Sequence, residues 1–367
     1  MTTVRIIADD LTGALDAAAP FVAVVGPLPV LWDAPSNPGS GDSFALDTET
    51  RDAKELGVDW LAGFHGADVA FKKIDSLLRG RTVDEIAACL ESGLFESVLI
   101  APAFPMQQRI TRHGQQHWRA GPDDDWQPVD CDLVAALTRR RAPIRRASSA
   151  AEIGGRGSFL CDAATEADLR AIVSAGSRLV EPVLWIGTAG LARVLAGPPA
   201  EVAPTTLPAP LLLVVGSHHP VTRAQVERLA AHAPEAITTV RPGGADLVAA
   251  VEDLAAGLDE RRRAALVLEL PDGTGGDVAG PWFDRVMDLA IRRLPAPGSL
   301  VVTGGATLHR LVRTLSARSL LVVGEPLPGI ARSRLEGGRW PGATVVSKSG
   351  AFGAPELLVR WWKLVHG

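Results

Sequence analysis

Residues 300–315 read LVVTGGATLHRLVRTL, and this stretch decides the expected fold. It opens with a short apolar run, breaks at Gly304-Gly305, and resumes with apolar residues at helical spacing from Leu308 to Leu315. The pattern predicts a strand, a glycine turn and a helix. Such a turn presents backbone N–H groups and a helix dipole to an anion, so it favours phosphate binding. A tight βα connection without a ligand is an equally good interpretation of one isolated turn.

The same pattern recurs along the chain and predicts an α/β fold. Strand-like runs lead into polar or glycine turns near residues 4–13, 183–190, 211–219 and 343–353. A chain of 367 residues is too long for one core. The stretch AGPPAEVAPTTLPAP, residues 196–210, carries five prolines and predicts a linker. We therefore expect two domains, each with a mostly parallel sheet flanked by helices: residues 1–196, a linker at 197–210, and residues 211–367.

Composition narrows the classes of function. Hydrophobic residues make up 47% of the chain, charged residues 22%, and the net charge is -5, which argues against disorder and a nucleic-acid surface. The sequence starts directly in a strand-like run and shows no leader or membrane-spanning stretch, so we expect no membrane partner. Cys89, Cys131 and Cys161 lack zinc spacing and suit a reducing cytoplasm. The sequence leaves a homo-oligomer open.

Charged side chains follow the expected strands of the N-terminal half. Asp9 and Asp10 end the first strand and precede an Ala-rich helix that we expect to stop at Pro20. One carboxylate is expected to cap that helix, and the other to bind a substrate hydroxyl or Mg²⁺. Arg51 is expected to clamp a carboxylate. Since parallel strands end at one edge of a sheet, these groups should meet there.

Two further segments bring polar groups to the same edge. The strand-like run 67–71 leads into KKIDSLLRG, residues 72–80, where packing hardly explains so many charges. The run 97–101 leads toward Gln107 and Arg109, which we place at the sheet edge as candidate substrate contacts. Residues 113–130 predict a hairpin or an irregular excursion.

In the C-terminal half the turns carry glycines, hydroxyls and a lysine. Lys348 follows a strand-like run and precedes Ser349-Gly350, so a second phosphate-binding turn is expected there. An acidic and cationic edge in one domain and a phosphate cradle in the other suit phosphoryl transfer with Mg²⁺. The sequence has no GxxxxGK and no HRD loop, which excludes P-loop and protein-kinase types.

Seven motifs in order, ADDLTGALDAA, DTETR, KKIDSLLRG, APAFPMQQRITRHG, VVGSHHPVTRAQ, VTGGATLHRL and SKSGAFG, closely resemble the four-carbon acid sugar kinase family over nearly the whole chain. The resemblance implies an ATP-dependent kinase that phosphorylates the terminal hydroxyl of a small sugar acid such as erythronate, threonate or their oxo forms. It implies that the N-terminal domain binds the acid and the C-terminal domain binds the nucleotide.

The resemblance also implies site residues. Those expected to contact the acid are Asp10, Arg51, Lys73, Ile74, Asp75 and Ser76, and those expected to contact ATP are Ser217, Gly304, Gly305, Ala306, Thr307 and Gly350. Asp10 is the expected catalytic base and Asp75 the runner-up. No metal ligand is assigned.

Two departures and two competing classes of function stay open. Leu77 stands where the family usually has threonine, and the segment after Arg109 is short, so the identity of the acid is in doubt. A phosphosugar isomerase or lyase of α/β fold would explain anion sites without a nucleotide. A non-catalytic sensor of sugar acid or nucleotide would keep the fold without turnover.

Overall fold

The computed structural model describes residues 2–33, 41–142, 144–198, 206–244, 246–271 and 276–366. The chain divides into two compact units, Met1–Glu201 and Val202–Gly367. This division falls inside the stretch predicted as a linker, of which residues 199–205 lie outside the described residues. The expected α/β class with two domains is confirmed.

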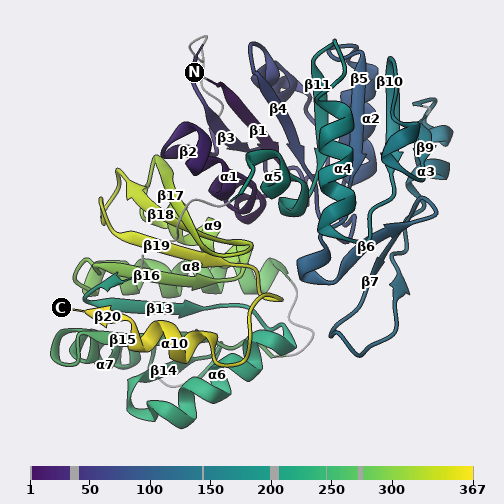
Figure 1. The fold of residues 1–367 in the computed structure, drawn as a ribbon. Coiled ribbons are helices and arrows are strands. Elements are labelled where there is room, and N and C mark those ends of the chain that lie inside the picture. Colours follow the sequence, from purple (N-terminus) through teal and green to yellow (C-terminus); the bar gives the residue numbers. More distant parts are fainter. Residues whose placement is uncertain are drawn as a thin grey trace. The chain divides into compact units, whose positions relative to one another are not determined.

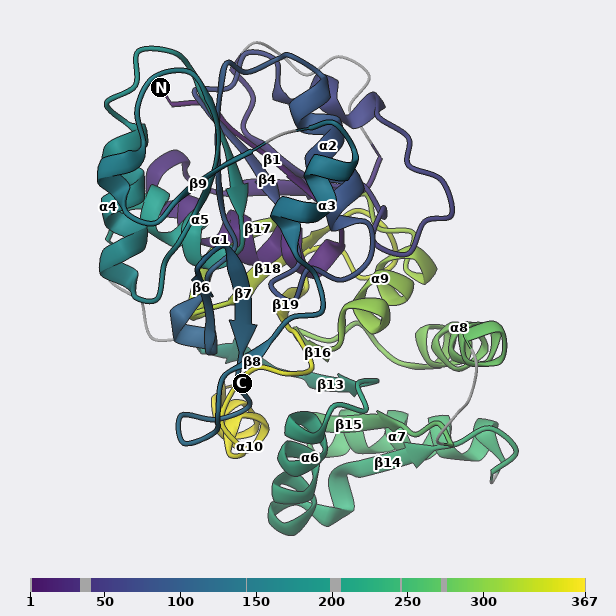
Figure 2. The same ribbon diagram turned by 90° about the vertical axis from the view of Figure 1, so that its right-hand side faces the viewer.

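The N-terminal unit is built on a parallel sheet with helices on both faces (Figures 1 and 2). Its strand order is β2-β3-β1-β4-β11-β5-β10-β9, and every pair in it is parallel. The strands are β1 (Val4–Ala8), β2 (Leu28–Leu31), β3 (Phe44–Asp47), β4 (Val69–Lys73), β5 (Ser97–Ala101), β9 (Arg145–Ala147), β10 (Gly157–Cys161) and β11 (Val183–Gly187).

Three helices pack together on one face of this sheet and two on the other (Figure 2). The first group is α1 (Leu11–Val25), α4 (Glu166–Gly176) and α5 (Ala189–Ala196), and the second is α2 (Thr82–Glu91) and α3 (Leu133–Arg139). The 3₁₀ turns are η1 (Asp59–Phe64), η2 (Pro105–Gln107) and η3 (Ala150–Glu152). Cys89 and Cys161 are buried, and all three cysteines are free.

Helix α1 corrects one expectation, because it runs through Pro20 instead of ending there. Proline removes one intrahelical hydrogen bond and usually breaks a helix. Here the residues Leu11 to Ala19 are all buried, and Phe21 beyond the proline is buried as well. Packing of this helix against the sheet therefore outweighs the local preference of proline.

The excursion predicted at residues 113–130 is a small antiparallel sheet. Its strands are β6 (Arg109–Arg112), β7 (Gln115–Trp118) and β8 (Gln127–Pro128), paired in that order. The β6–β7 hairpin turns at His113-Gly114, whose N–H groups both donate to Asp162.

The C-terminal unit has a mixed sheet in the order β14-β15-β13-β16-β19-β18-β17. The first five strands are parallel, and the β19-β18-β17 meander is antiparallel. The strands are β13 (Leu211–Val215), β14 (Ile237–Val240), β15 (Arg263–Leu268), β16 (Ser299–Thr303), β17 (Ser319–Leu327), β18 (Ile330–Glu336) and β19 (Thr344–Lys348), with a separate pair β12 (Leu207–Pro208) and β20 (Val365–His366).

Helices again cover both faces of this sheet (Figure 2). One face carries α6 (Pro220–His232) and α10 (Leu357–Lys363), and the other carries α7 (Leu247–Glu260), α8 (Gly276–Arg293) and α9 (Gly305–Thr314), while η4 (Pro234–Ala236) follows α6. The predicted strand, glycine turn and helix at residues 300–315 are confirmed as β16 and α9. Within the described part of the chain, none of the helices has the length and apolar character to cross a membrane.

Candidate active site

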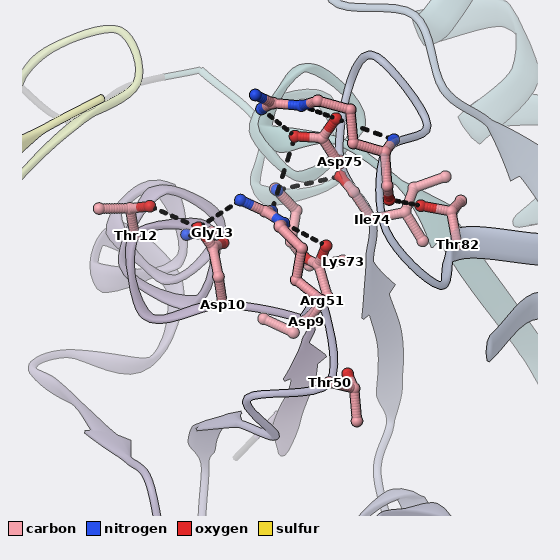
Figure 3. A network of polar contacts seen from close by, with 12 residues as sticks. Asp9, Asp10, Thr12, Gly13, Thr50, Arg51, Lys73, Ile74, Asp75 and Thr82 are labelled. Carbon is pink, nitrogen blue, oxygen red and sulfur yellow. Dashed lines mark hydrogen bonds and ion pairs between the residues drawn. The ribbon is translucent and has the colours of Figure 1, made fainter. Parts of the chain in front are cut away.

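In the N-terminal unit three neighbouring strands deliver charged residues to one edge of the sheet. Ala8 at the end of β1 pairs with Asp47 on one side and Lys73 on the other. Because the strands are parallel, the residues after their carboxyl ends converge. Figure 3 shows the result, in which Asp10, Arg51 and Asp75 point toward one another.

Arg51 is the centre of this cluster. Its Nε and Nη2 donate to the two oxygens of Asp9 at 2.9 and 3.0 Å, and its Nη1 donates to Asp10 Oδ2 at 2.6 Å. Its Nη2 also lies 3.6 Å from Asp75 Oδ1. Burial acts to lower the pKa of Arg51, but the three carboxylates outweigh it and raise the pKa above its ordinary value. Arg51 is thus held by the protein itself, which limits what it can offer to a substrate carboxylate.

The two adjacent aspartates have different surroundings. Asp9 is 1% exposed, and burial acts to raise its pKa, but Arg51 and the nearby lysines outweigh this and hold the pKa below its usual range. Asp10 is the N-cap of α1: its Oδ1 accepts the Gly13 N–H at 2.8 Å and its Oδ2 accepts the Thr12 hydroxyl at 2.8 Å. The Asp10 side chain is 20% exposed. Asp10 therefore combines the capping role with access to solvent.

Asp75 is tied to its own loop. Its Oδ2 accepts the N–H groups of Leu77 and Arg79 and the Arg79 Nε at 2.8 Å, and its Oδ1 accepts Arg79 Nη2 at 2.6 Å. Burial acts to raise the pKa of Asp75, but the hydrogen bonds and charges of Arg79 and Arg51 outweigh it and hold the pKa far below its usual range. A carboxylate that holds its proton so weakly makes a poor base.

Arg79 is a member of the cluster that the sequence did not reveal. It lies four residues after Asp75 in an irregular turn, where no periodicity indicates which way a side chain points. The only sequence signal was the charge density of residues 72–80.

Lys73 adds a positive charge to the cluster. Among the described residues, no carboxylate lies at ion-pair distance from it. It is 6% exposed, and its Nζ donates to the Ile74 carbonyl at 3.0 Å. A Cβ on Gly13 would lie 2.9 Å from this Nζ and 2.5 Å from Asp10 Oδ1. Glycine at position 13 therefore leaves the space in which Lys73 and Asp10 face each other.

The other predicted acid contacts lie in or around this edge. Ile74 is buried in the core, so only its main chain faces the cluster. The main-chain carbonyl of Ser76 accepts a hydrogen bond from Gln116 Nε2 at 2.9 Å. Gln107 lies in η2, and Arg109 at the start of β6 donates through Nη1 to the carbonyls of Gln107, Gln108 and Arg119. The structure thus gives Arg109 a role in holding the hairpin.

In the C-terminal unit three parallel strands end beside one another, and each is followed by a turn that contains glycine. Val215 of β13 pairs with Thr303 of β16, which pairs with Lys348 of β19. The turns that follow contain Gly216-Ser217, Gly304-Gly305 and Ser349-Gly350. The sequence predicted two of these turns as phosphate sites, and the register brings all three together.

The turns approach one another too closely for side chains. A Cβ on Gly216 would lie 2.2 Å from Thr307 Oγ1, and one on Gly350 would lie 2.0 Å from Ser217 Oγ. Gly304 has φ +99, a conformation that favours glycine. Gly304 also precedes α9 without a side-chain cap, so the first N–H groups of this helix, at Gly305 to Thr307, have no intrahelical partner. This arrangement can bind an anion.

Lys348 lies beneath this cradle. It is fully buried, and its Nζ donates to the Ser349 carbonyl at 3.0 Å and to Thr222 Oγ1 at 3.4 Å. Thr222 in turn donates to the Gly350 carbonyl at 2.7 Å. Burial lowers the pKa of Lys348 to about 7. A bound phosphate would stabilise its charged form.

Comparison with known proteins assigns a domain to each unit. Residues 4–129 match the family described as "Sugar-binding N-terminal domain", and residues 212–358 match the "Nucleotide-binding C-terminal domain". The matched ranges contain the charged sheet edge and the glycine cradle, respectively.

Two curated relatives align over nearly their whole length. A D-threonate kinase of Cupriavidus necator is 31% identical, covering 98% of this chain and 97% of the relative. A D-erythronate kinase of Heliobacterium modesticaldum is 26% identical, covering 96% and 94%.

Two solved structures share the fold. A Salmonella typhimurium protein has a TM-score of 0.72 at 20% identity, covering 98% of both chains. A Haemophilus influenzae protein has a TM-score of 0.67 at 18% identity, covering 98% of this chain and 99% of the other.

Proposed function

We propose, from the premise that this chain belongs to the four-carbon acid sugar kinase family, that it transfers a phosphoryl group from ATP to the terminal hydroxyl of D-threonate or D-erythronate. The observation that carries the nucleotide part is the cradle of Gly216, Gly304 and Gly350 around the uncapped N-terminus of α9, inside the region that matches a nucleotide-binding domain.

In this proposal the C-terminal unit holds the phosphates of ATP. The N–H groups of Gly305, Ala306 and Thr307, which have no partner within the helix, donate to phosphate oxygens, and Ser217 adds a hydroxyl. Lys348 supplies positive charge from below the turn. Mg²⁺ would be held largely by the phosphates of ATP and by water, as is usual for this ion. When bound it neutralises charge that develops on the transferred group.

The N-terminal unit orients the acid and its hydroxyl. Among the described residues, no carboxylate lies at ion-pair distance from Lys73, so its charge can attract the carboxylate of the substrate. Arg51 contributes through its partly exposed edge. Asp10 accepts the hydroxyl proton, since it is the more exposed aspartate of the cluster. Asp75 is the weaker candidate because Arg79 and Arg51 hold its pKa so low.

Thermal-shift titration tests whether both ligands bind. A ligand at 100 times its Kd stabilises the folded state by about 2.7 kcal/mol. We expect Mg·ATP alone and D-threonate or D-erythronate alone each to raise the Tm. Stabilisation by the acid with none by Mg·ATP would contradict a kinase and favour an isomerase or lyase.

A further inference from the structure

A fully buried ion pair, Lys72 with Glu85, lies next to the candidate acid site, and neither residue is among those expected to contact the acid. Lys72 Nζ on β4 lies 2.9 Å from Glu85 Oε1 on α2, and the two side chains are 0% and 1% exposed. Lys72 also faces the ring of Trp60 at 5.1 Å. Glu85 Oε2 is buried and, among the described residues, has no hydrogen-bond partner.

Such a pair is a poor way to stabilise a core. The desolvation of two charges commonly equals or exceeds their attraction, so well-packed apolar residues are often as stable or more stable. The unpartnered oxygen adds to this cost. The surroundings are apolar, with Trp60, Ile86 and Cys89 in the same buried cluster. The pair must therefore be considered for a role other than stability.

Glu85 connects the pair to the loop that carries Arg51. Its Oε1 accepts a hydrogen bond from the hydroxyl of Thr50, the residue before Arg51. Thr48, two residues earlier, donates its N–H and hydroxyl to the Ala8 carbonyl at 2.9 and 2.8 Å. The Arg51 N–H donates to the Asp9 carbonyl at 3.1 Å. The loop is thus held at both the end of β1 and at Glu85.

Lys72 connects the pair to the other cation of the site. Consecutive residues of a strand point to opposite faces of the sheet, so Lys72 points toward α2 while Lys73 points toward Gly13 of α1. Lys72 Nζ also lies 3.4 Å from the Lys73 carbonyl. The side chain of Glu85 is therefore bonded directly to the neighbours in sequence of both Arg51 and Lys73.

We propose that Lys72, Glu85 and Thr50 are positioning residues that fix Arg51 and Lys73 for the sugar acid. The inference rests on the proposed function. A displacement of about 1 Å in a positioned group can cost about 10²-fold in rate. Loss of the Thr50 hydroxyl should therefore act on the sugar acid and on turnover, while the affinity for ATP, which belongs to the other unit, stays the same.

The test compares Thr50→Val with Thr50→Ser, because only serine keeps the hydroxyl. We expect kcat/KM for the sugar acid to fall about 10²-fold in Thr50→Val, with an unchanged Kd for Mg·ATP, and to stay near wild type in Thr50→Ser. Thr138→Val, at an exposed threonine of α3, is the matched control. Wild-type kcat/KM in Thr50→Val, or equal losses in both Thr50 variants, would overturn the inference.

A double variant separates positioning from stability. Lys72→Met with Glu85→Leu removes both charges and should keep a Tm close to wild type, yet lose kcat/KM for the sugar acid to a similar extent. Glu91→Gln, at an exposed glutamate of the same helix, is its control. A folded double variant with wild-type kinetics would show that the pair belongs only to the core.

The failure of the proposed function gives a different result. If the wild-type protein phosphorylates no sugar acid, the function is wrong, and a crystal structure of Thr50→Val then decides the inference. Arg51 should leave its two-point contact with Asp9 in that variant. An Arg51 that keeps both bonds, at 2.9 and 3.0 Å in the wild-type structure, would overturn the inference independently of activity.

Discussion

Replacement of Gly350 by alanine tests the cradle directly. The added Cβ would lie 2.0 Å from Ser217 Oγ, 3.0 Å from Ser217 Cβ and 3.3 Å from His219 Cβ. Rotation of the Ser217 hydroxyl relieves only the first of these contacts, so the turn that carries Ser217 must also shift by a few tenths of an ångström. The hydroxyl then no longer faces the position proposed for phosphate.

The expected loss follows from one hydrogen bond to a charged group. Such a bond contributes about 1.5–3 kcal/mol, which corresponds to an increase of about 10- to 150-fold in the Kd of Mg·ATP. Isothermal titration calorimetry measures this Kd. Binding of the sugar acid should not change, because the site proposed for the acid lies in the N-terminal unit.

Two further variants make the result specific. Gly324→Ala is the control, since a Cβ there meets nothing within 4 Å. Ser217→Ala should weaken Mg·ATP by itself and reduce the additional effect of Gly350→Ala, because both changes remove the same contact. A folded Gly350→Ala protein with wild-type affinity for Mg·ATP would refute the reasoning.

The remaining predictions concern the base, the acid pocket and pH. Asp10→Asn should lower kcat by about 10²- to 10⁴-fold with a much smaller change in binding of the sugar acid; normal turnover in this variant together with a loss in Asp75→Asn would exchange the two roles. Leu77, which replaces a hydroxyl, should let the enzyme accept acids with one hydroxyl missing, oxidised or replaced, and make it poor on at least one of erythronate and threonate. Coupled ADP-release assays over a panel of sugar acids check this, and strict, efficient use of one four-carbon acid would contradict it. Burial lowers the pKa of Lys348 to about 7 in the folded protein. Between about pH 7 and the ordinary pKa of lysine, the unfolded chain therefore binds one more proton than the folded protein. The free energy of unfolding should rise with pH over this range. A bound phosphate favours the charged form of Lys348, so the affinity for ATP should fall as the pH rises over the same range. A Kd that calorimetry finds unchanged with pH would contradict this.

The sequence predicted the strands and turns well, for a definite reason. Apolar runs followed by glycine or aspartate are local signals, and parallel pairing then places every turn at the same edge. The meeting of Asp10 and Arg51 followed from this rule, and Asp75 joins them from the charged segment 72–80, which the rule places at the same edge. The prediction that the first helix ends at Pro20 was wrong, because the residues buried on both sides of Pro20 keep α1 continuous.

What the sequence could not show is how the charges pair. Asp9 and Asp10 are adjacent residues of the same type and both contact Arg51, yet Asp9 is buried, whereas Asp10 caps α1 and its side chain is 20% exposed. Lys72 and Glu85 are separated by a strand end and a turn, and no periodicity indicates that they meet. Side-chain direction at irregular turns depends on packing across the sheet, which only the structure supplies.

The central claim is that this chain transfers phosphate from ATP to a four-carbon sugar acid. Incubation of the purified protein with Mg·ATP and D-threonate or D-erythronate, followed by ³¹P NMR of the products, tests it most directly. We predict ADP together with a new phosphomonoester signal coupled to the protons of the terminal carbon of the acid, and neither product without the acid. ADP release that does not depend on the acid, or a phosphate signal absent with both acids, would contradict the account.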